Sequence, residues 1–466
     1  MMRGWLAGGP IVMIDRAPRS PRPQWNALSP LMSRIGGGLI VKVCQAGLAF
    51  LVMIFLTRSI GAEVFGEFAF GVATAALVAV FSRYGFHVYI VYAVNRALAQ
   101  GAGTELRRIL IISGSFVAIL SSAAALMLHM LAGAVPGWSM SVPTQAAAWL
   151  IAPVAIVQVA GGALQALDRV VLGQALEGIG RPLVFCLYVA IAWGAGVGLD
   201  VQTLLLAFGL AEVTLIVIAA GLIAGRLHAV TLRNLPSRPI QHNVWRYHIR
   251  AATPFVLANG MVQLYMLAGL IAVGIWMSAS DVAVYRVASQ VAGLIAFGLQ
   301  ALQAALQPSI AHASATPQAL STVQRQLTLG TRGLSLALSP VVVLCFFWPD
   351  WLLSLFDASF ENHGAVLRIL AIGQTVSLLS GVNGAILNMN GLAWITARWS
   401  GMAFGVQCVL IALLLPSFGI LGIAMADALS RVIWNLALVR AASVRTGLYS
   451  SVFGVGFLPP SRQAVS

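Results

Sequence analysis

Charged residues are scarce in this chain. Asp, Glu, Lys and Arg together make up 9% of the 466 residues, whereas a soluble domain carries about 25%. Hydrophobic residues account for 59% of the sequence, and the mean hydropathy is +0.91. So little charge excludes an ordinary soluble domain. The composition instead indicates a polytopic membrane protein.

Groups that carry chemistry are also few. The four cysteines lie inside apolar stretches, and no pair has the spacing of metal ligands. The chain has no Walker motif for binding nucleotide phosphates and no clustered catalytic residues. We therefore predict neither a metal, a cofactor nor an enzymatic activity.

In place of these features, the chain has a series of apolar stretches between about residues 35 and 440. A hydrocarbon core about 30 Å thick needs roughly 20 apolar residues per helix. The predicted fold is therefore an all-α integral membrane protein with about twelve transmembrane helices. Their expected bounds are 35–56, 68–91, 109–131, 146–166, 182–199, 201–224, 254–277, 283–305, 328–348, 364–388, 397–415 and 419–440.

Acidic residues are outnumbered, with 13 Asp and Glu against 27 Lys and Arg. In a soluble protein this excess would suggest nucleic acid as a partner. Here the basic residues lie between the apolar stretches, where they set topology and meet anionic lipid headgroups. Basic loops alternate with neutral or acidic ones, with Arg58 as the one exception on the outer side. The pattern predicts a protein of the cell inner membrane with both termini cytoplasmic and no nucleic-acid partner.

An internal repeat divides the chain at a basic segment. The connection LTRSIGAEVFGEF at 56–68 matches SASDVAVYRVASQ at 278–290, with an offset of about 217 residues. Two six-helix lobes in the same orientation, flanking a central cavity, are expected from such a repeat. The predicted organisation is a disordered cytoplasmic tail (1–34), an N-terminal lobe (35–224), a basic cytoplasmic linker (225–250), a C-terminal lobe (251–440) and a cytoplasmic tail (441–466).

Five segments carry a resemblance to a known family. They are LTRSIGAEVFGEF at 56–68, DVAVYRVASQ at 281–290, QPSIAHA at 307–313, GQTVSLLSGVNGAILNMNG at 373–391 and LLPSFGILGIAMADALSR at 414–431. Together they resemble the polysaccharide-transporter branch of the multidrug/oligosaccharidyl-lipid/polysaccharide (MOP) flippase superfamily. That branch contains the lipid-linked oligosaccharide flippases of O-antigen and exopolysaccharide synthesis. The chain departs from longer members, because it has no clear thirteenth and fourteenth helices.

The resemblance implies a flippase that works by alternating access. Its substrate would be a polyprenyl-pyrophosphate-linked oligosaccharide or a related polysaccharide precursor. The expected partners are this lipid-linked glycan, the bilayer and other polysaccharide-assembly proteins. Two alternatives remain open at this stage. One is an exporter of drugs or of a peptidoglycan precursor from the same superfamily, and the other is a membrane-embedded polymerase or glycosyltransferase.

Polar residues within the predicted helices are candidates for the substrate cavity, because polar groups are costly at membrane depth. Lys42 and Gln45 share one face of the first helix, and Asn259 and Gln263 share one face of the seventh. The repeat offset places Asn259 at the position equivalent to Lys42. The alternative for Lys42 is that its long stem reaches the headgroups.

Further cavity candidates have alternative structural roles. Arg83 and Arg286 lie near predicted helix ends, and their alternative role is to anchor those ends to lipid phosphates. Gln290, Gln374 and Asn383 would equally form hydrogen bonds between helices.

Two acidic residues, Glu212 and Asp427, fall inside the predicted sixth and twelfth helices. A buried carboxylate can carry a proton, so both are candidates for coupling transport to an ion. The alternative is a structural hydrogen bond or ion pair, for which Arg431 lies one turn after Asp427.

Overall fold

The structure is a computed structural model that describes residues 25–99, 103–134, 140–167, 169–231, 244–311 and 317–454. Helices are the only regular elements in these ranges. They are α1 (Trp25–Ser82), α2 (Phe86–Ala99), α3 (Gly103–Gly133), α4 (Ser141–Ala148), α5 (Ile151–Ala166), α6 (Val170–Ala175), η1 (Leu176–Gly180), α7 (Arg181–Gly194), α8 (Val201–Thr231), α9 (Val244–Trp276), α10 (Ala279–Ala311), α11 (Pro317–Phe347), α12 (Pro349–Ser354), η3 (Ala358–His363), α13 (Gly364–Ser380), α14 (Asn383–Met389) and α15 (Ala393–Thr446).

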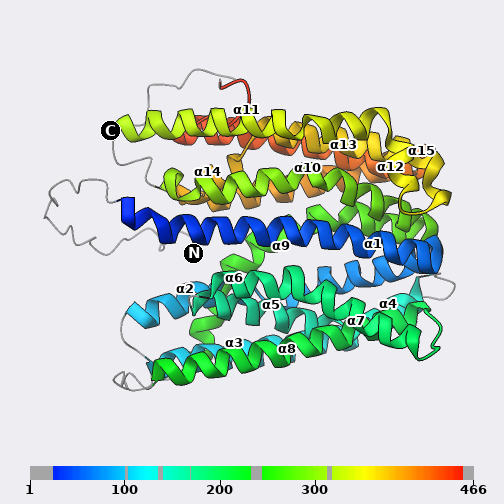
Figure 1. The fold of residues 1–466 in the computed structure, drawn as a ribbon, viewed down its shortest axis with the longest axis horizontal. Coiled ribbons are helices and arrows are strands. Elements are labelled where there is room, and N and C mark those ends of the chain that lie inside the picture. Colours follow the sequence, from blue (N-terminus) through cyan, green and yellow to red (C-terminus); the bar gives the residue numbers. More distant parts are fainter. Residues whose placement is uncertain are drawn as a thin grey trace, which may run out of the picture.

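The two longest helices each contain a sharp break at a glycine. Gly61 in α1 has φ 78° and Gly419 in α15 has φ 55°. Glycine enters this positive-φ region without the steric cost that a side chain imposes. At both breaks the chain reverses, so each helix forms two antiparallel arms (Figure 1). The repeat offset of 217 carries Gly61 to Ser278, which lies in the short junction between α9 and α10.

The described residues contain nine helices long and apolar enough to cross a membrane, or ten when α4 and α5, bent by 47°, count as one. If α1 and α15 are each divided in two, at Gly61 and Gly419, the number of spans in the described residues rises from ten to twelve. The predicted all-α membrane fold is therefore confirmed.

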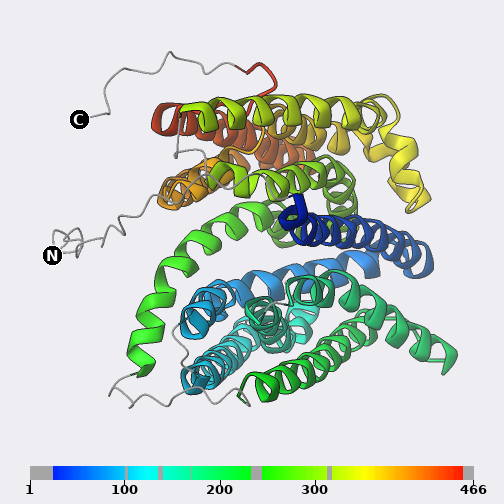
Figure 2. The same cartoon turned by 60° about the vertical axis from the view of Figure 1, so that its left-hand side comes forward.

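The helices form two bundles, which we call the N lobe (α1 to α8) and the C lobe (α9 to α15). In Figure 1 the N lobe lies below and the C lobe above, with the first arm of α1 between them. This first arm packs along α10 of the C lobe. Figure 2 shows the first half of α9 arching from the N lobe up to the C lobe.

At the end where α1 reverses, the lobes meet through their backbones. Gly66 lies so close to the carbonyl oxygen of Ala279 that a side chain on this glycine would collide with it. Thr57 donates a hydrogen bond of 2.9 Å to the carbonyl of Phe356. The Arg58 side chain donates to another carbonyl of the same turn. Arg58, the one basic residue that departs from the predicted charge pattern, thus forms a hydrogen bond between the lobes.

At the opposite end, a break between α1 and α2 contacts α9. Tyr84 in this break has φ 50° and is the only described non-glycine residue with a positive φ. Its hydroxyl lies 3.2 Å from the Thr253 hydroxyl, and the Tyr89 hydroxyl lies 2.6 Å from Nδ1 of His248. The lobes are therefore in contact at both ends of the molecule.

Several helices extend beyond their predicted bounds. α1 begins at Trp25, inside the segment predicted as a disordered tail. α8 continues to Thr231 and α9 begins at Val244, so helix covers both sides of the predicted linker 225–250. α15 continues to Thr446, six residues into the predicted C-terminal tail. Hydropathy marks only the part of a helix that lies in hydrocarbon, and polar turns continue past it.

Two predicted spans are interrupted. The span 68–91 breaks at Arg83–Gly85, and the span 364–388 breaks at Gly381, where φ is 79°. The short gap near Asp200 is a turn, as expected. Asp200 caps α8 by accepting a 2.8 Å hydrogen bond from the backbone N–H of Thr203, and this bonding lowers the pKa of the Asp200 carboxyl.

Candidate functional site

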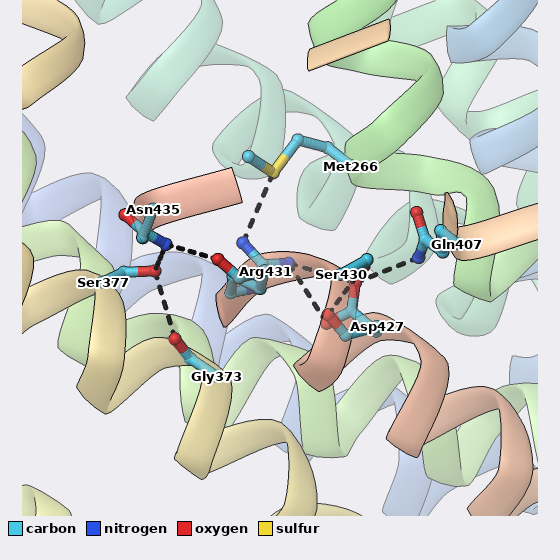
Figure 3. Close-up of polar contacts among 8 residues, drawn as sticks. All are labelled: Met266, Gly373, Ser377, Gln407, Asp427, Ser430, Arg431 and Asn435. Carbon is cyan, nitrogen blue, oxygen red and sulfur yellow. Dashed lines mark hydrogen bonds and ion pairs between the residues drawn. The ribbon is translucent and has the colours of Figure 1, made fainter. Parts of the chain in front are cut away.

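A buried ion pair lies in the second arm of α15. Arg431 follows Asp427 by one helical turn, so both side chains are on the same face. The guanidinium of Arg431 donates to both carboxylate oxygens of Asp427, at 3.2 and 3.1 Å, and each side chain is 8% exposed (Figure 3). The structure therefore contains the Asp427–Arg431 ion pair, which the sequence indicated as the alternative to a coupling role for Asp427.

Neighbouring helices supply further contacts to this pair. Nε2 of Gln407, on the first arm of α15, donates to Asp427 Oδ1 at 3.2 Å. The guanidinium carbon of Arg431 lies 5.6 Å from the ring centroid of Tyr265, within the range of a cation–π interaction. The sulfur of Met266, also on α9, lies 3.8 Å from Nη1 of Arg431 (Figure 3). Desolvated charges of this kind require such partners.

A hydrogen-bonded chain ties α13 to the same region of α15. Asn435 donates to the Ser377 hydroxyl and to the carbonyl of Arg431, both at 2.8 Å. Ser377 in turn donates to the carbonyl of Gly373 at 3.1 Å (Figure 3). A Cβ on Gly373 would lie 3.1 Å from the backbone of Ala428, so glycine permits the close approach of the two helices. These bonds hold the ion pair in a fixed place.

A small cavity of about 50 Å³ opens beside the pair, and we call it the charged pocket. Asp427 and Arg431 line it together with Arg286 and Ser289 of α10 and Gln374 of α13. No described carboxylate lies within ion-pairing distance of Arg286. Two guanidinium groups and one carboxylate leave a net positive charge, so the pocket favours an anionic group. Its volume suffices for a few waters or a small ion, and not for a glycan.

The N lobe also buries an acidic residue. Glu212 on α8 is fully buried and pairs with Arg181 on α7, whose side chain is 22% exposed. The Arg181 guanidinium lies 6.0 Å from the ring centroid of Phe208. Tyr188 and Thr214 join the same two helices through a 2.9 Å hydrogen bond. The pair therefore links neighbouring helices at a packed contact.

A second N-lobe cluster forms around the π-helix η1. The guanidinium of Arg83 donates to Oε1 of Gln158 on α5, and the charge of Glu177 acts on it. A Cβ on Gly161, one turn after Gln158, would lie 2.8 Å from a carboxylate oxygen of Glu177. A Cβ on Gly178 would lie 2.7 Å from Oε1 of Gln45. Two predicted cavity residues, Gln45 and Arg83, thus lie on either side of an acidic residue.

The structure brings three of the predicted residues together in the charged pocket, namely Arg286, Gln374 and Asp427. The other candidates whose side chains the structure describes lie elsewhere. Asn259 donates to the Phe255 carbonyl on its own helix, and Asn383 donates to the Ser380 carbonyl beside the break at Gly381.

Gln263 and Gln290 are half-buried and do not line the charged pocket. The side chain of Lys42 lies outside the described residues, so its predicted match in depth with Asn259 remains a prediction.

Sequence reasoning missed Arg181, Glu177, Gln158 and Tyr265. Glu177 and Arg181 fall between the predicted spans 146–166 and 182–199, whereas the helix of the structure runs without a gap from Val170 to Gly194. The predicted span begins at Pro182, although proline is compatible with the first turn of a helix that begins at Arg181. Gln158 and Tyr265 had no signal in the sequence beyond being polar residues in apolar stretches.

A family model described as polysaccharide biosynthesis protein matches residues 37–314, more than half of the chain. The chain belongs to this family. No curated protein matches it significantly. The match begins in the first arm of α1 and continues through α10, so it includes Arg286 but not Asp427 or Arg431.

Solved structures with the same fold come from the MOP superfamily. The lipid II flippase MurJ in its inward closed conformation has a TM-score of 0.65 at 10% identity, covering 87% of each chain. An inward-facing multidrug resistance MATE family transporter has a TM-score of 0.64 at 15% identity, covering 83% of this chain and 96% of its own. The Vibrio cholerae MATE transporter VcmN has a TM-score of 0.61 at 15% identity, covering 90% and 97%. These structures show that the fold is shared, and the family match over residues 37–314 confirms the polysaccharide family recognised from the sequence.

Proposed function

We propose that this protein moves a polyprenyl-pyrophosphate-linked oligosaccharide from the inner to the outer leaflet by alternating access of its two lobes. The observation that carries this proposal is the match to the polysaccharide biosynthesis family over residues 37–314, on a fold shared with MurJ and MATE transporters. In this proposal the protein carries out no catalytic step. It lies in the cell inner membrane with both termini in the cytoplasm.

The net positive charge of the charged pocket supports the proposal of a substrate with an anionic group. Arg286 presents a guanidinium at membrane depth with no described carboxylate to neutralise it. Guanidinium groups bind phosphate oxygens through charge-assisted hydrogen bonds. We assign the pyrophosphate of the substrate to Arg286, with the Asp427–Arg431 pair beside it, in a conformation in which the lobes have moved apart and the pocket is wider than the about 50 Å³ of this structure. A drug exporter for cations would place the opposite charge in this position.

The decisive experiment measures translocation of the glycolipid in proteoliposomes. The wild-type protein should move a fluorescent lipid-linked oligosaccharide between leaflets, and Arg286→Gln should stop this movement while Arg286→Lys retains part of it. Arg440→Gln is the matched control, because Arg440 is exposed and lies outside the charged pocket. Normal translocation by Arg286→Gln would remove the pyrophosphate assignment.

A deletion strain separates the alternative functions. We expect loss of surface or secreted polysaccharide, with the lipid-linked precursor retained on the cytoplasmic leaflet. Loss of a polymerase would leave single repeat units already translocated, and loss of a drug exporter would leave the polysaccharide intact. Normal long-chain polysaccharide in the deletion strain, without a redundant transporter, would contradict the proposal.

Topology is tested with single cysteines on a cysteine-free background. Ser280→Cys lies at the start of α10 and Asn95→Cys lies in α2, and both positions are exposed. A membrane-impermeant thiol reagent applied to intact cells should label the first and not the second. Labelling of Asn95→Cys alone would invert the proposed orientation.

A further inference from the structure

A second and larger cavity lies on the other side of α9. Its volume is about 750 Å³, and we call it the apolar hollow. Its walls are α9 and the first arm of α15, with Leu77 of α1 on a third side, and no charged residue lines it. Protein interiors contain few voids larger than a water molecule, whereas ligand sites have volumes of about 300–1,000 Å³. The apolar hollow is therefore the size of a binding site.

The lining of the hollow extends along two helices. It runs from Leu264 to Met277, along α9 and just past its end, and from Phe404 to Gly419 on α15. At a rise of about 1.5 Å per residue these stretches are each roughly 20 Å long, which is about two-thirds of a hydrocarbon core of about 30 Å. This length is sufficient for part of a hydrocarbon chain that lies along the two helices.

Near each end of the hollow, a methionine in or directly after α9 approaches a glycine of α15. A Cβ on Gly401 would lie 3.6 Å from the sulfur of Met261, and a Cβ on Gly419 would lie 3.6 Å from the terminal carbon of Met277. Between these contacts, small residues such as Ala268 and Ala412 leave space between the two helices. The space is thus a defined feature of the α9–α15 packing.

The hollow and the charged pocket lie on opposite faces of α9. On α9, Leu264 and Ala268 face the hollow, while Met266 lines the charged pocket. On α15, Phe404 lines the hollow, while Gln407 donates to Asp427 (Figure 3). A helix with its side chains is about 10–12 Å across. An apolar site and a charged site therefore lie one helix apart.

We infer that the apolar hollow holds the hydrocarbon tail of the lipid-linked substrate whose pyrophosphate binds at Arg286. This inference rests on the proposed function. Apolar cavities stay dry, so hydrocarbon is the matching occupant at this depth. A lipid tail gains no hydrophobic free energy on leaving the bilayer, because the bilayer is equally apolar. A tail tethered to a bound headgroup nevertheless has a high effective concentration at the hollow, which a bulk phospholipid lacks.

The first test fills the hollow. Ala268→Trp and Ala412→Trp place an indole in the space, and Leu206→Trp is the control, because Leu206 lies on the membrane-facing side of α8 and is 65% exposed. Translocation is measured for two substrates with the same oligosaccharide pyrophosphate, one on a long polyprenyl tail and one on a short tail. Both filled variants should slow the long-tailed substrate roughly tenfold or more and leave the short-tailed one unchanged.

Two results would overturn the inference. One is long-tail translocation by the filled variants at the rate of Leu206→Trp, and the other is an equal loss with both tails. Failure of the wild-type protein to move either substrate would instead contradict the proposed function.

A second test uses the wild-type protein and so does not depend on the folding of the variants. A lipid-linked oligosaccharide with a photoreactive group in its tail should cross-link to the hollow-lining segments of α9 and α15. Unlabelled substrate should compete for this cross-linking. A photoreactive phospholipid should label these segments weakly. Equal phospholipid labelling that the substrate does not reduce would show that ordinary membrane lipid occupies the hollow.

Discussion

The two lobes both bury an acidic residue late in their sequence, but they neutralise it differently. Glu212 is fully buried and takes its partner, Arg181, from another helix 31 residues earlier. Asp427 takes Arg431 from its own helix. The N-lobe pair therefore fastens α7 to α8. The C-lobe ion pair itself joins no two helices. Arg431 contacts Tyr265 and Met266 of α9, and Gln407 and the Asn435–Ser377 chain make further contacts between helices.

Because the C-lobe pair lies on one helix, it can line a cavity without loosening a contact between helices. Asp427 and Arg431 line the charged pocket with Arg286, whereas the N-lobe pair lies at a helix contact that includes the Tyr188–Thr214 bond. A pair that fastens two helices cannot separate without loosening them. A pair on one helix can exchange its partner for a ligand or a proton while the packing stays in place. From this comparison we propose a structural role for Glu212 and a functional role for Asp427.

The largest effect on stability is expected from breaking the C-lobe pair. Asp427→Asn leaves the Arg431 guanidinium buried without its counter-charge, which typically costs about 3–5 kcal/mol. The double variant Asp427→Asn with Arg431→Met should recover most of this loss, because it removes both charges together. Thermal unfolding of the purified protein in detergent measures both. A double variant as unstable as the single one would contradict the ion-pair explanation.

A smaller loss is expected from the N-lobe pair. Glu212→Gln should cost about 1–3 kcal/mol, because Arg181 is 22% exposed and can turn toward polar surroundings. Thr214→Val is the control, since it removes one neutral hydrogen bond between the same helices, worth about 0.5–1.5 kcal/mol. Glu212→Gln should transport at a reduced but measurable rate if its role is structural. Complete loss of transport in a stable Glu212→Gln protein would contradict the structural role and indicate that Glu212 couples transport to an ion.

The fold was predictable where local sequence decides it. Apolar length located the spans, and the predicted repeat aligned the connection at 56–68, in which α1 reverses, with the connection at 278–290, which begins between α9 and α10. The spacing of Asp427 and Arg431 made their pairing predictable, because residues four apart share a helix face. Each of these signals lies within one helix or one connection.

Features that depend on packing between helices were not predictable. The break at Tyr84 is stabilised by its contact with Thr253, which lies 169 residues away. Arg286 was expected at the outer start of a helix beginning at residue 283. α10 instead begins at Ala279, so Arg286 lies about two turns inside it. Hydropathy underestimates such depth, because Asp281 and Arg286 lower the apolar score of the first turns.

The contact between the lobes is expected to tolerate the loss of one bond. Thr253→Val removes the 3.2 Å interaction with the Tyr84 hydroxyl and should cost about 0.5–1.5 kcal/mol. Thr57→Val, at the opposite end, removes the 2.9 Å bond to the Phe356 carbonyl and should cost a similar amount. Thermal unfolding compares the two ends directly. A loss beyond about 3 kcal/mol at either position would show that this end carries most of the lobe association.

The smallest effect on stability is expected at Arg286, where function should be lost most completely. Arg286→Met removes a guanidinium that has no described carboxylate partner, so no buried charge is left unpaired by the change. The unfolding free energy should shift by no more than about 0.5 kcal/mol, or should rise, because removal of desolvated charge often stabilises a protein. Functional sites commonly sacrifice stability in this way. Arg431→Met, which leaves Asp427 buried and unpaired, is the contrasting variant and should be clearly destabilised. Equal destabilisation by the two substitutions would show that Arg286 has a structural partner, and the charged pocket would then lose its assignment as the phosphate site.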